Sequence, residues 1–159
     1  MAERGESRPR SGVKKLRYIA AVLAIAVAAV HLLHPRLGAP RLVMFLEFGT
    51  LLDPRPLAFT LAGFFIVFGI VLVYQGLFVR AVYLGGIALM LVFVFGYVAW
   101  HTVLNHGGFW PHIHAHGHDG GVVETVWIHL VSDTYAMVSK LLEAALLAVL
   151  VALYRLDSL

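Results

Sequence analysis

Four long apolar runs, nearly free of charged residues, constrain this chain more than any other feature. A membrane-spanning helix needs roughly 20 apolar residues, and three of the runs have that length. The fourth run is free of charge only over residues 144–154, so it spans only if it begins near Thr134 and encloses Lys140 and Glu143. We favour the longer version, because a helix that ended within hydrocarbon would leave backbone groups unsatisfied. The sequence therefore predicts an all-α integral membrane protein, a four-transmembrane-helix bundle with spans at about 16–34, 57–79, 81–101 and 134–155.

Composition agrees with this class. Only 13% of the residues are charged, about half of the roughly 25% that a soluble domain carries. The chain has no cysteine, which excludes disulfides, thiolate metal sites and iron–sulfur clusters. The excess of basic residues is better explained by orientation in a lipid bilayer than by nucleic acid, so no nucleic-acid partner is expected.

The basic residues predict the orientation of the spans. Half of the 12 Lys and Arg residues lie within the first 17 positions, Arg80 lies in the second connection, and Arg155 lies near the carboxyl end. The positive-inside tendency then puts both termini in the cytoplasm, at the plasma membrane. The first apolar run loosely resembles a signal peptide that could be cleaved near Ala39, but its length favours an uncleaved helix.

The connections complete the predicted organisation. Residues 1–12 are expected to be a disordered basic amino terminus, followed by one transmembrane domain over 13–159. The first outer connection contains a short helix at about 41–52, too short to span and expected at the membrane interface. The second outer connection, residues 102–121, is rich in glycine and histidine.

In this topology all nine histidines fall on the extracytoplasmic side. Imidazole is the commonest metal-binding side chain, and the absence of cysteine favours Zn(II) or Cu(II) over Cu(I). Alternate residues of an extended segment share one side, so the outer loop can present a row of ligands. The alternative is that the loop only scavenges metal in vitro and serves as a pH-sensitive spacer. The candidate ligands of this loop are His106, His112, His114, His116 and His118.

A second group of histidines lies at the outer ends of the predicted helices. We expect these residues to converge on one layer and to form a metal site, with an acidic residue nearby. The alternative is that each imidazole is interfacial and hydrogen-bonds to water, headgroups or carbonyl oxygens. The histidines are His31, His34, His101 and His129, and the acidic candidates are Asp133, Glu47 and Asp53.

The last span carries ionisable residues, which are costly in lipid and indicate function by default. The spacing of 4, 3, 4 and 3 predicts one stripe on a helix face, formed by His129, Asp133, Ala136, Lys140 and Glu143. Such a track could carry protons or ions. The alternative is a buried structural ion pair between Lys140 and Glu143, or a Lys140 that extends to the interface.

Three function classes remain open. The first is a metal-handling membrane protein that binds Zn or Cu for transport, sensing or delivery. The second is a haem-binding electron-transfer or oxidase-accessory subunit, with His31 or His34 and His101 as axial ligands. The third is a structural subunit of a membrane complex or homo-oligomer. No phosphate loop, nucleophile elbow or HExxH motif is found, which argues against an enzyme.

Overall fold

The structure is a computed structural model that describes residues 8–115 and 120–156. Within these ranges it contains six α-helices, one single-turn 3-10 helix and no strand. The elements are α1 (Arg8–Leu33), α2 (Ala39–Glu47), α3 (Arg55–Tyr74), α4 (Val79–His101), η1 (Asn105–Gly107), α5 (Val122–Ser132) and α6 (Thr134–Leu156).

The four predicted spans are confirmed as long apolar helices. Segments Gly12–Leu33, Arg55–Tyr74, Val79–His101 and Thr134–Leu156 are each long and apolar enough to cross a membrane. Helix α1 begins at Arg8, within the segment expected to be disordered. Pro9 explains this early start, because proline is tolerated in the first turn of a helix, where its missing N–H costs nothing. Helix α2 begins earlier and ends earlier than expected, with Pro40 likewise in its first turn.

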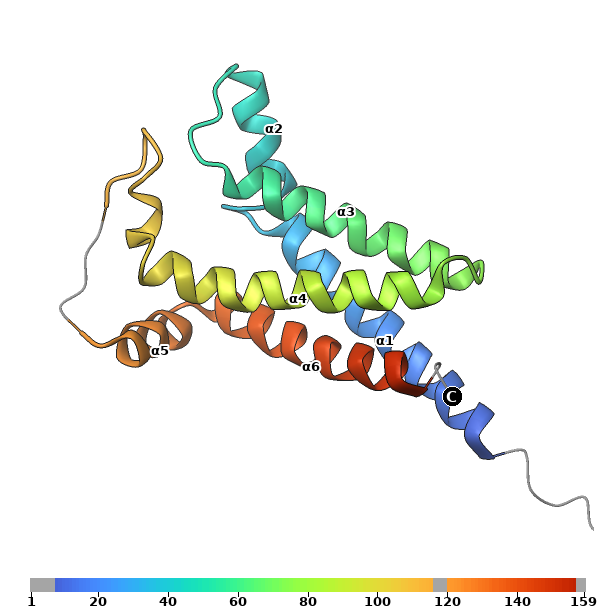
Figure 1. Cartoon of the computed structure of the whole chain (residues 1–159). Helices are drawn as coiled ribbons and strands as arrows, with labels where there is room; N and C mark the ends of the chain where they lie inside the picture. The colour runs from blue at the N-terminus through green and yellow to red at the C-terminus, as the bar shows by residue number, and fades with distance from the viewer. Residues whose placement is uncertain (1–7, 116–119, 157–159) are drawn as a thin grey trace, which may run out of the picture.

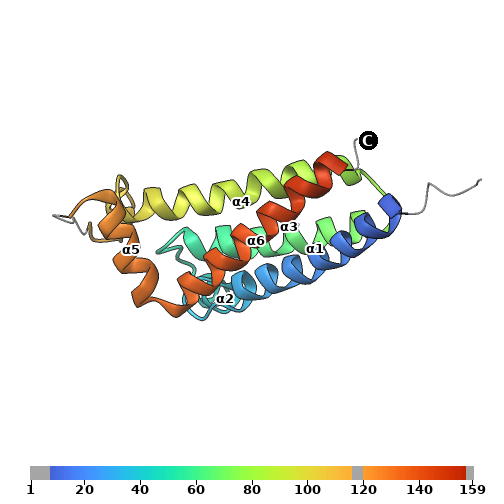
Figure 2. The ribbon, with the colours of Figure 1, turned by 90° about the horizontal axis from the view of Figure 1, so that it is seen from below.

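Helix α1 packs along both α3 and α6, and α4 packs along α6. Figure 1 shows α4 and α6 side by side, with α1 crossing behind them. The view from below in Figure 2 shows α5 lying across one end of this group of helices. The buried core is mostly apolar and draws on three of these helices: Val27 and Ala28 on α1, Met90 on α4, and Leu146, Leu150 and Leu153 on α6.

The last two helices differ from the sequence prediction of one continuous stripe. Helix α5 ends at Ser132, and α6 begins at Thr134 after an extended residue, Asp133. The Oδ1 atom of Asp133 accepts hydrogen bonds from the backbone N–H groups of Tyr135 (2.9 Å) and Ala136 (3.2 Å). A short acidic side chain that caps the following helix in this way ends the preceding one. The stripe was therefore wrong: His129 lies on α5, whereas Lys140 and Glu143 lie on α6.

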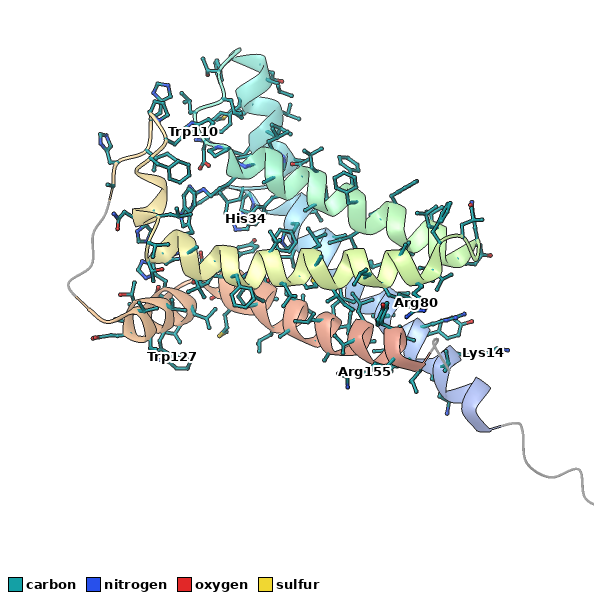
Figure 3. The ribbon with its side chains drawn as sticks, viewed as in Figure 1. Lys14, His34, Arg80, Trp110, Trp127 and Arg155 are labelled. Carbon is teal, nitrogen blue, oxygen red and sulfur yellow. The ribbon has the colours of Figure 1, made fainter. Side chains whose placement is uncertain are left out.

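Three basic residues and two tryptophans mark opposite ends of the molecule. Figure 3 shows Lys14, Arg80 and Arg155 at one end, which we call the basic end. Trp110 and Trp127 lie at the other end, where α1 and α4 finish and α6 begins, and which we call the histidine end.

Candidate functional site

Three histidines from three different elements meet at the histidine end. His101 is the last residue of α4, His106 lies in η1, and His129 lies in the last turn of α5. One ring nitrogen of each lies within 4.8 Å of those of the other two. The Nε2 atoms of His106 and His129 are 3.2 Å apart, and the ring of His101 lies 4.6 Å from that of His129 between centroids. We call these three residues the histidine triad.

Backbone carbonyls orient two members of the triad. The Nδ1–H of His101 donates to the carbonyl oxygen of Tyr97 at 2.9 Å, and the Nδ1–H of His129 donates to that of Thr125 at 2.8 Å. Each bond joins residues four apart, so each helix supplies its own acceptor. A hydrogen bond that holds Nδ1–H leaves Nε2 as the unprotonated nitrogen of the neutral ring, which is the form that binds a metal. In His129 this Nε2 lies at hydrogen-bond distance from Nε2 of His106. The triad thus resembles a set of ligands with their outer-shell partners in place.

The third member is presented by an unusual backbone. Asn105, His106 and Gly107 all have positive φ angles, of 43°, 57° and 82°. Non-glycine residues rarely adopt this left-handed conformation, and each such residue costs about 1–3 kcal/mol. Asn, His and Gly are among the residues that tolerate it best. This turn reverses the chain after α4 and brings His106 back against His101, with ring centroids 4.9 Å apart.

Gly107 fixes the turn against α4. A Cβ atom at this position would lie 2.2 Å from the ring of Trp100, so any larger residue would collide with the indole. Trp100 also contacts Arg55, whose guanidinium lies 4.3 Å from the centre of the indole ring. Arg55 in turn forms an ion pair with Asp53 at 2.6 Å. The left-handed turn therefore packs against the Trp100 ring, which is itself in contact with Arg55.

The three histidines of the triad could hold a metal ion if their ring nitrogens moved slightly closer together. Tetrahedral zinc binds imidazole nitrogen at about 2.0–2.1 Å, which places ligand nitrogens roughly 3.3 Å apart. The triad nitrogens lie within 4.8 Å of one another, so the side chains must close by about 1.5 Å or less. Three imidazoles leave the fourth position of zinc open, as in catalytic or exchanging sites. All three histidines are half-buried, so an ion has access from solvent.

The structure divides the predicted helix-end histidines between two places. His101 and His129 join His106 in the triad, whereas His31 and His34 contact α3. The haem hypothesis paired His31 or His34 with His101, and the structure places the first two against Phe59 of α3 and His101 in the triad. His112 and His114 are exposed, and His116 and His118 lie outside the described residues. Asp133 caps α6 and Asp53 pairs with Arg55, so the structure gives both carboxylates other partners.

A second cluster of polar residues lies inside the helices. His31, on α1, is fully buried between the rings of Phe59 and Phe93, with centroid distances of 4.8 and 4.3 Å. Its Nε2 atom lies 3.5 Å from Oε1 of Glu143, which is also fully buried. Lys140 donates to Oε2 of Glu143, and Ser139 donates to Oε1 at 2.7 Å. We call His31, Ser139, Lys140 and Glu143 the buried cluster.

His34 directly follows α1, whose last residue is Leu33, and so lies outside the span. Its Nδ1 accepts hydrogen bonds from the backbone N–H groups of Arg36 and Leu37, both at 3.2 Å. Burial lowers the pKa of His34 below its usual value of 6.5, and the nearby Asp133 opposes this shift. Both the hydrogen bonds and the burial favour a neutral ring at pH 7.

Sequence reasoning missed the grouping of these residues. It did not pair His31 with Glu143, because residues on the first and last spans have no sequence relation that shows contact. It named His106 only as a loop ligand. The signal for its special place was the segment Asn105-His106-Gly107-Gly108, a run of residue types that favour positive φ.

In comparisons with known proteins, no family model, no curated protein and no solved structure matches the chain.

Proposed function

We propose that this chain is a multi-pass membrane protein that binds a transition-metal ion, Zn(II) or Cu(II), at the histidine triad. One observation carries the proposal. His101, His106 and His129 come from three elements, and two of them have Nδ1 held by backbone carbonyls so that Nε2 faces the shared centre. Histidine clusters also occur without metals, but this one depends on a left-handed turn, and strained backbone of that kind is concentrated at functional sites.

The proposed topology puts the triad on the extracytoplasmic side. Lys14, Arg80 and Arg155 gather at the basic end, opposite the triad, and the positive-inside tendency assigns that end to the cytoplasm. Both termini are then cytoplasmic, and α2 lies at the outer interface. The exposed His112 and His114 precede the undescribed part of the loop and deliver metal to the triad from the outer solution.

The three-ligand arrangement favours exchange over permanent storage. A structural zinc site is closed by four protein ligands, whereas a site with three ligands keeps one position for water or an incoming donor. In this proposal the ion enters and leaves through that position. The chain acts in uptake, sensing or delivery of the metal, and no catalytic role is proposed.

Metal titration of the purified protein in lipid nanodiscs tests the proposal. We expect one Zn(II) or Cu(II) ion to bind with high affinity, and His106→Asn to weaken this binding by more than about 100-fold. Loss of a ligand should exceed the 10–100-fold effect of losing an outer-shell partner. Asparagine is the matched replacement, because it also tolerates the left-handed backbone at φ 57°.

His112→Asn is the control for this experiment. His112 is exposed and lies outside the triad, so its replacement should change the affinity of the high-affinity ion by less than about threefold, within ordinary surface effects. Isothermal titration calorimetry with both metals measures the affinities. Equal binding by the parent protein and His106→Asn would refute the triad as the site. Loss of binding in His112→Asn alone would move the site to the loop.

A further inference from the structure

The buried cluster contains an unmatched nitrogen that the metal proposal does not use. The Nδ1–H of His31 donates to the carbonyl oxygen of Val27 at 2.9 Å, so in the neutral ring Nε2 carries only a lone pair. This Nε2 is fully buried and has no hydrogen-bond partner among the described residues. It faces Oε1 of Glu143 at 3.5 Å. Two acceptor atoms thus point at each other, without a proton between them.

The other groups around this gap hydrogen-bond to both oxygens of the carboxylate. Lys140 donates to Oε2 of Glu143 and also to the carbonyl oxygen of Phe93 at 3.2 Å. Ser139 donates to Oε1, the oxygen that faces His31. The remaining neighbours on α3 and α4 are the uncharged rings of Phe59, Phe93 and Tyr97. His34, which directly follows α1, accepts hydrogen bonds at Nδ1 from two backbone N–H groups, and these favour its neutral form.

We propose that His31 and Glu143 form an intramembrane proton-binding site. Nε2 of His31 takes one proton from hydronium: an O–H bond of hydronium breaks, water is released, and the new N–H bond is directed at Oε1 of Glu143. The carboxylate itself gains no proton in this step. The charge of the buried cluster rises from zero, with Lys140 and Glu143 paired, to plus one. The added N–H···O bond converts a repulsive contact into a charge-assisted one.

A structural ion pair alone does not account for this arrangement. Lys140 and Glu143 already neutralise each other, so a phenylalanine or leucine at position 31 would fill the space without exposing a lone pair to an anionic oxygen. A divalent cation is also a poor occupant. Among the described residues, the ligand atoms that meet across the gap are Nε2 of His31 and Oε1 of Glu143, fewer than a metal ion needs. The Lys140 ammonium, paired with the same carboxylate, would also repel the ion. A proton is the one ligand that needs no further donors.

All four spans contribute to the site. His31 comes from α1, Phe59 from α3, Phe93 from α4 and Glu143 from α6. Uptake of a proton therefore changes the interaction at the point where the four helices meet. The site is separate from the histidine triad, and its proton binding is independent of whether the triad binds metal.

Nitrogen-15 NMR of histidine-labelled protein in lipid nanodiscs tests the proposal, with His31→Gln to assign the resonance. In the parent protein we expect His31 to change from the neutral ring to the imidazolium between pH 8.5 and 4.5. Glu143→Gln removes the anionic acceptor, so the change should require at least about tenfold more acid. Ser139→Ala removes a competing donor from Oε1, so the change should occur at lower acid concentration than in the parent.

The opposite directions of these two variants keep the test decisive. If Glu143→Gln does not fold, as judged by circular dichroism, the comparison of Ser139→Ala with the parent still decides. His112→Gln, in the exposed loop, is the control and should leave the His31 transition unchanged. A His31 ring that stays neutral throughout the range, or a transition that neither variant moves, would overturn the proposal.

Discussion

At the scale of single residues, the left-handed turn at Asn105, His106 and Gly107 is the feature of the candidate metal site that restricts residue type most. Sequence alone named all three triad members as possible ligands but grouped two of them with His31 and His34. Spacing along a helix predicts which residues share a face, and on α1 and α4 that reasoning gave the correct end of the molecule. It cannot predict a turn in which Asn105, His106 and Gly107 all have positive φ. The pairing of His31 with Glu143 was likewise out of reach, because it depends on how α1 packs against α6.

Gly107→Ala should damage both the turn and the metal site. A methyl group at φ 82° is strained by about 1–2 kcal/mol, and it would also meet the Trp100 ring at 2.2 Å. We expect a lower thermal unfolding midpoint in detergent and a zinc affinity reduced by at least about tenfold, because His106 moves with the turn.

Gly49→Ala separates these two causes. Gly49 also has a positive φ, of 64°, but no heavy atom lies within 4 Å of the added Cβ. This variant should show a smaller loss of stability from backbone strain alone and unchanged zinc affinity. Equal effects of the two substitutions on zinc binding would contradict the role given to the contact with Trp100.

At the scale of helices, the four long helices could be predicted well, because a helix suited to lipid needs a long apolar run with few charged residues. The predicted spans differ from the helices mainly at their ends: α1 begins at Arg8 rather than near 16, and α3 ends at Tyr74 rather than near 79. Hydrophobicity alone does not fix the residue at which a helix begins or ends. The break at Asp133 was missed for a physical reason. The spacing from His129 to Glu143 fits one helix, but the Asp133 carboxylate accepts the first N–H groups of α6 and so begins a new helix.

Asp133→Ala should therefore destabilise the start of α6. Loss of an N-cap costs about 1 kcal/mol, so we expect a lower unfolding midpoint and faster amide hydrogen exchange at Tyr135 and Ala136. Asp133→Asn keeps an oxygen acceptor in the same place and should retain most of the stability. If the alanine and asparagine variants were equally stable, the capping role would be rejected.

At the scale of the whole molecule, an apolar layer separates the buried cluster from the basic end. Beyond Glu143, toward the basic end, the buried side chains of α6 are Leu146, Leu150 and Leu153, packed with Met90. Tyr83 supplies a hydroxyl group in this region, but no further ionisable side chain is buried there among the described residues. A proton that reaches His31 from the histidine end thus has no relay through the apolar half.

We therefore expect the protein to bind a proton without conducting it. Proteoliposomes loaded with a pH-sensitive dye should show no proton flux above that of empty vesicles when a pH gradient is applied with valinomycin and potassium. Glu143→Gln and Lys140→Met should behave like the parent. Flux in the parent that Glu143→Gln removes would show instead that the four helices contain a conduction path.

The meeting of all four spans at His31 has a consequence for biosynthesis. Chains emerge from the ribosome amino end first, so in the proposed membrane topology α1, α3 and α4 would insert before α6 is made. Until α6 packs against α1, the imidazole of His31 would lack contact with the Glu143 carboxylate. Helix α6 carries Lys140 and Glu143 already paired, which lowers the charge that it brings into the bilayer. The docking of this last helix is thus the step at which the newly made protein first acquires its place for a proton.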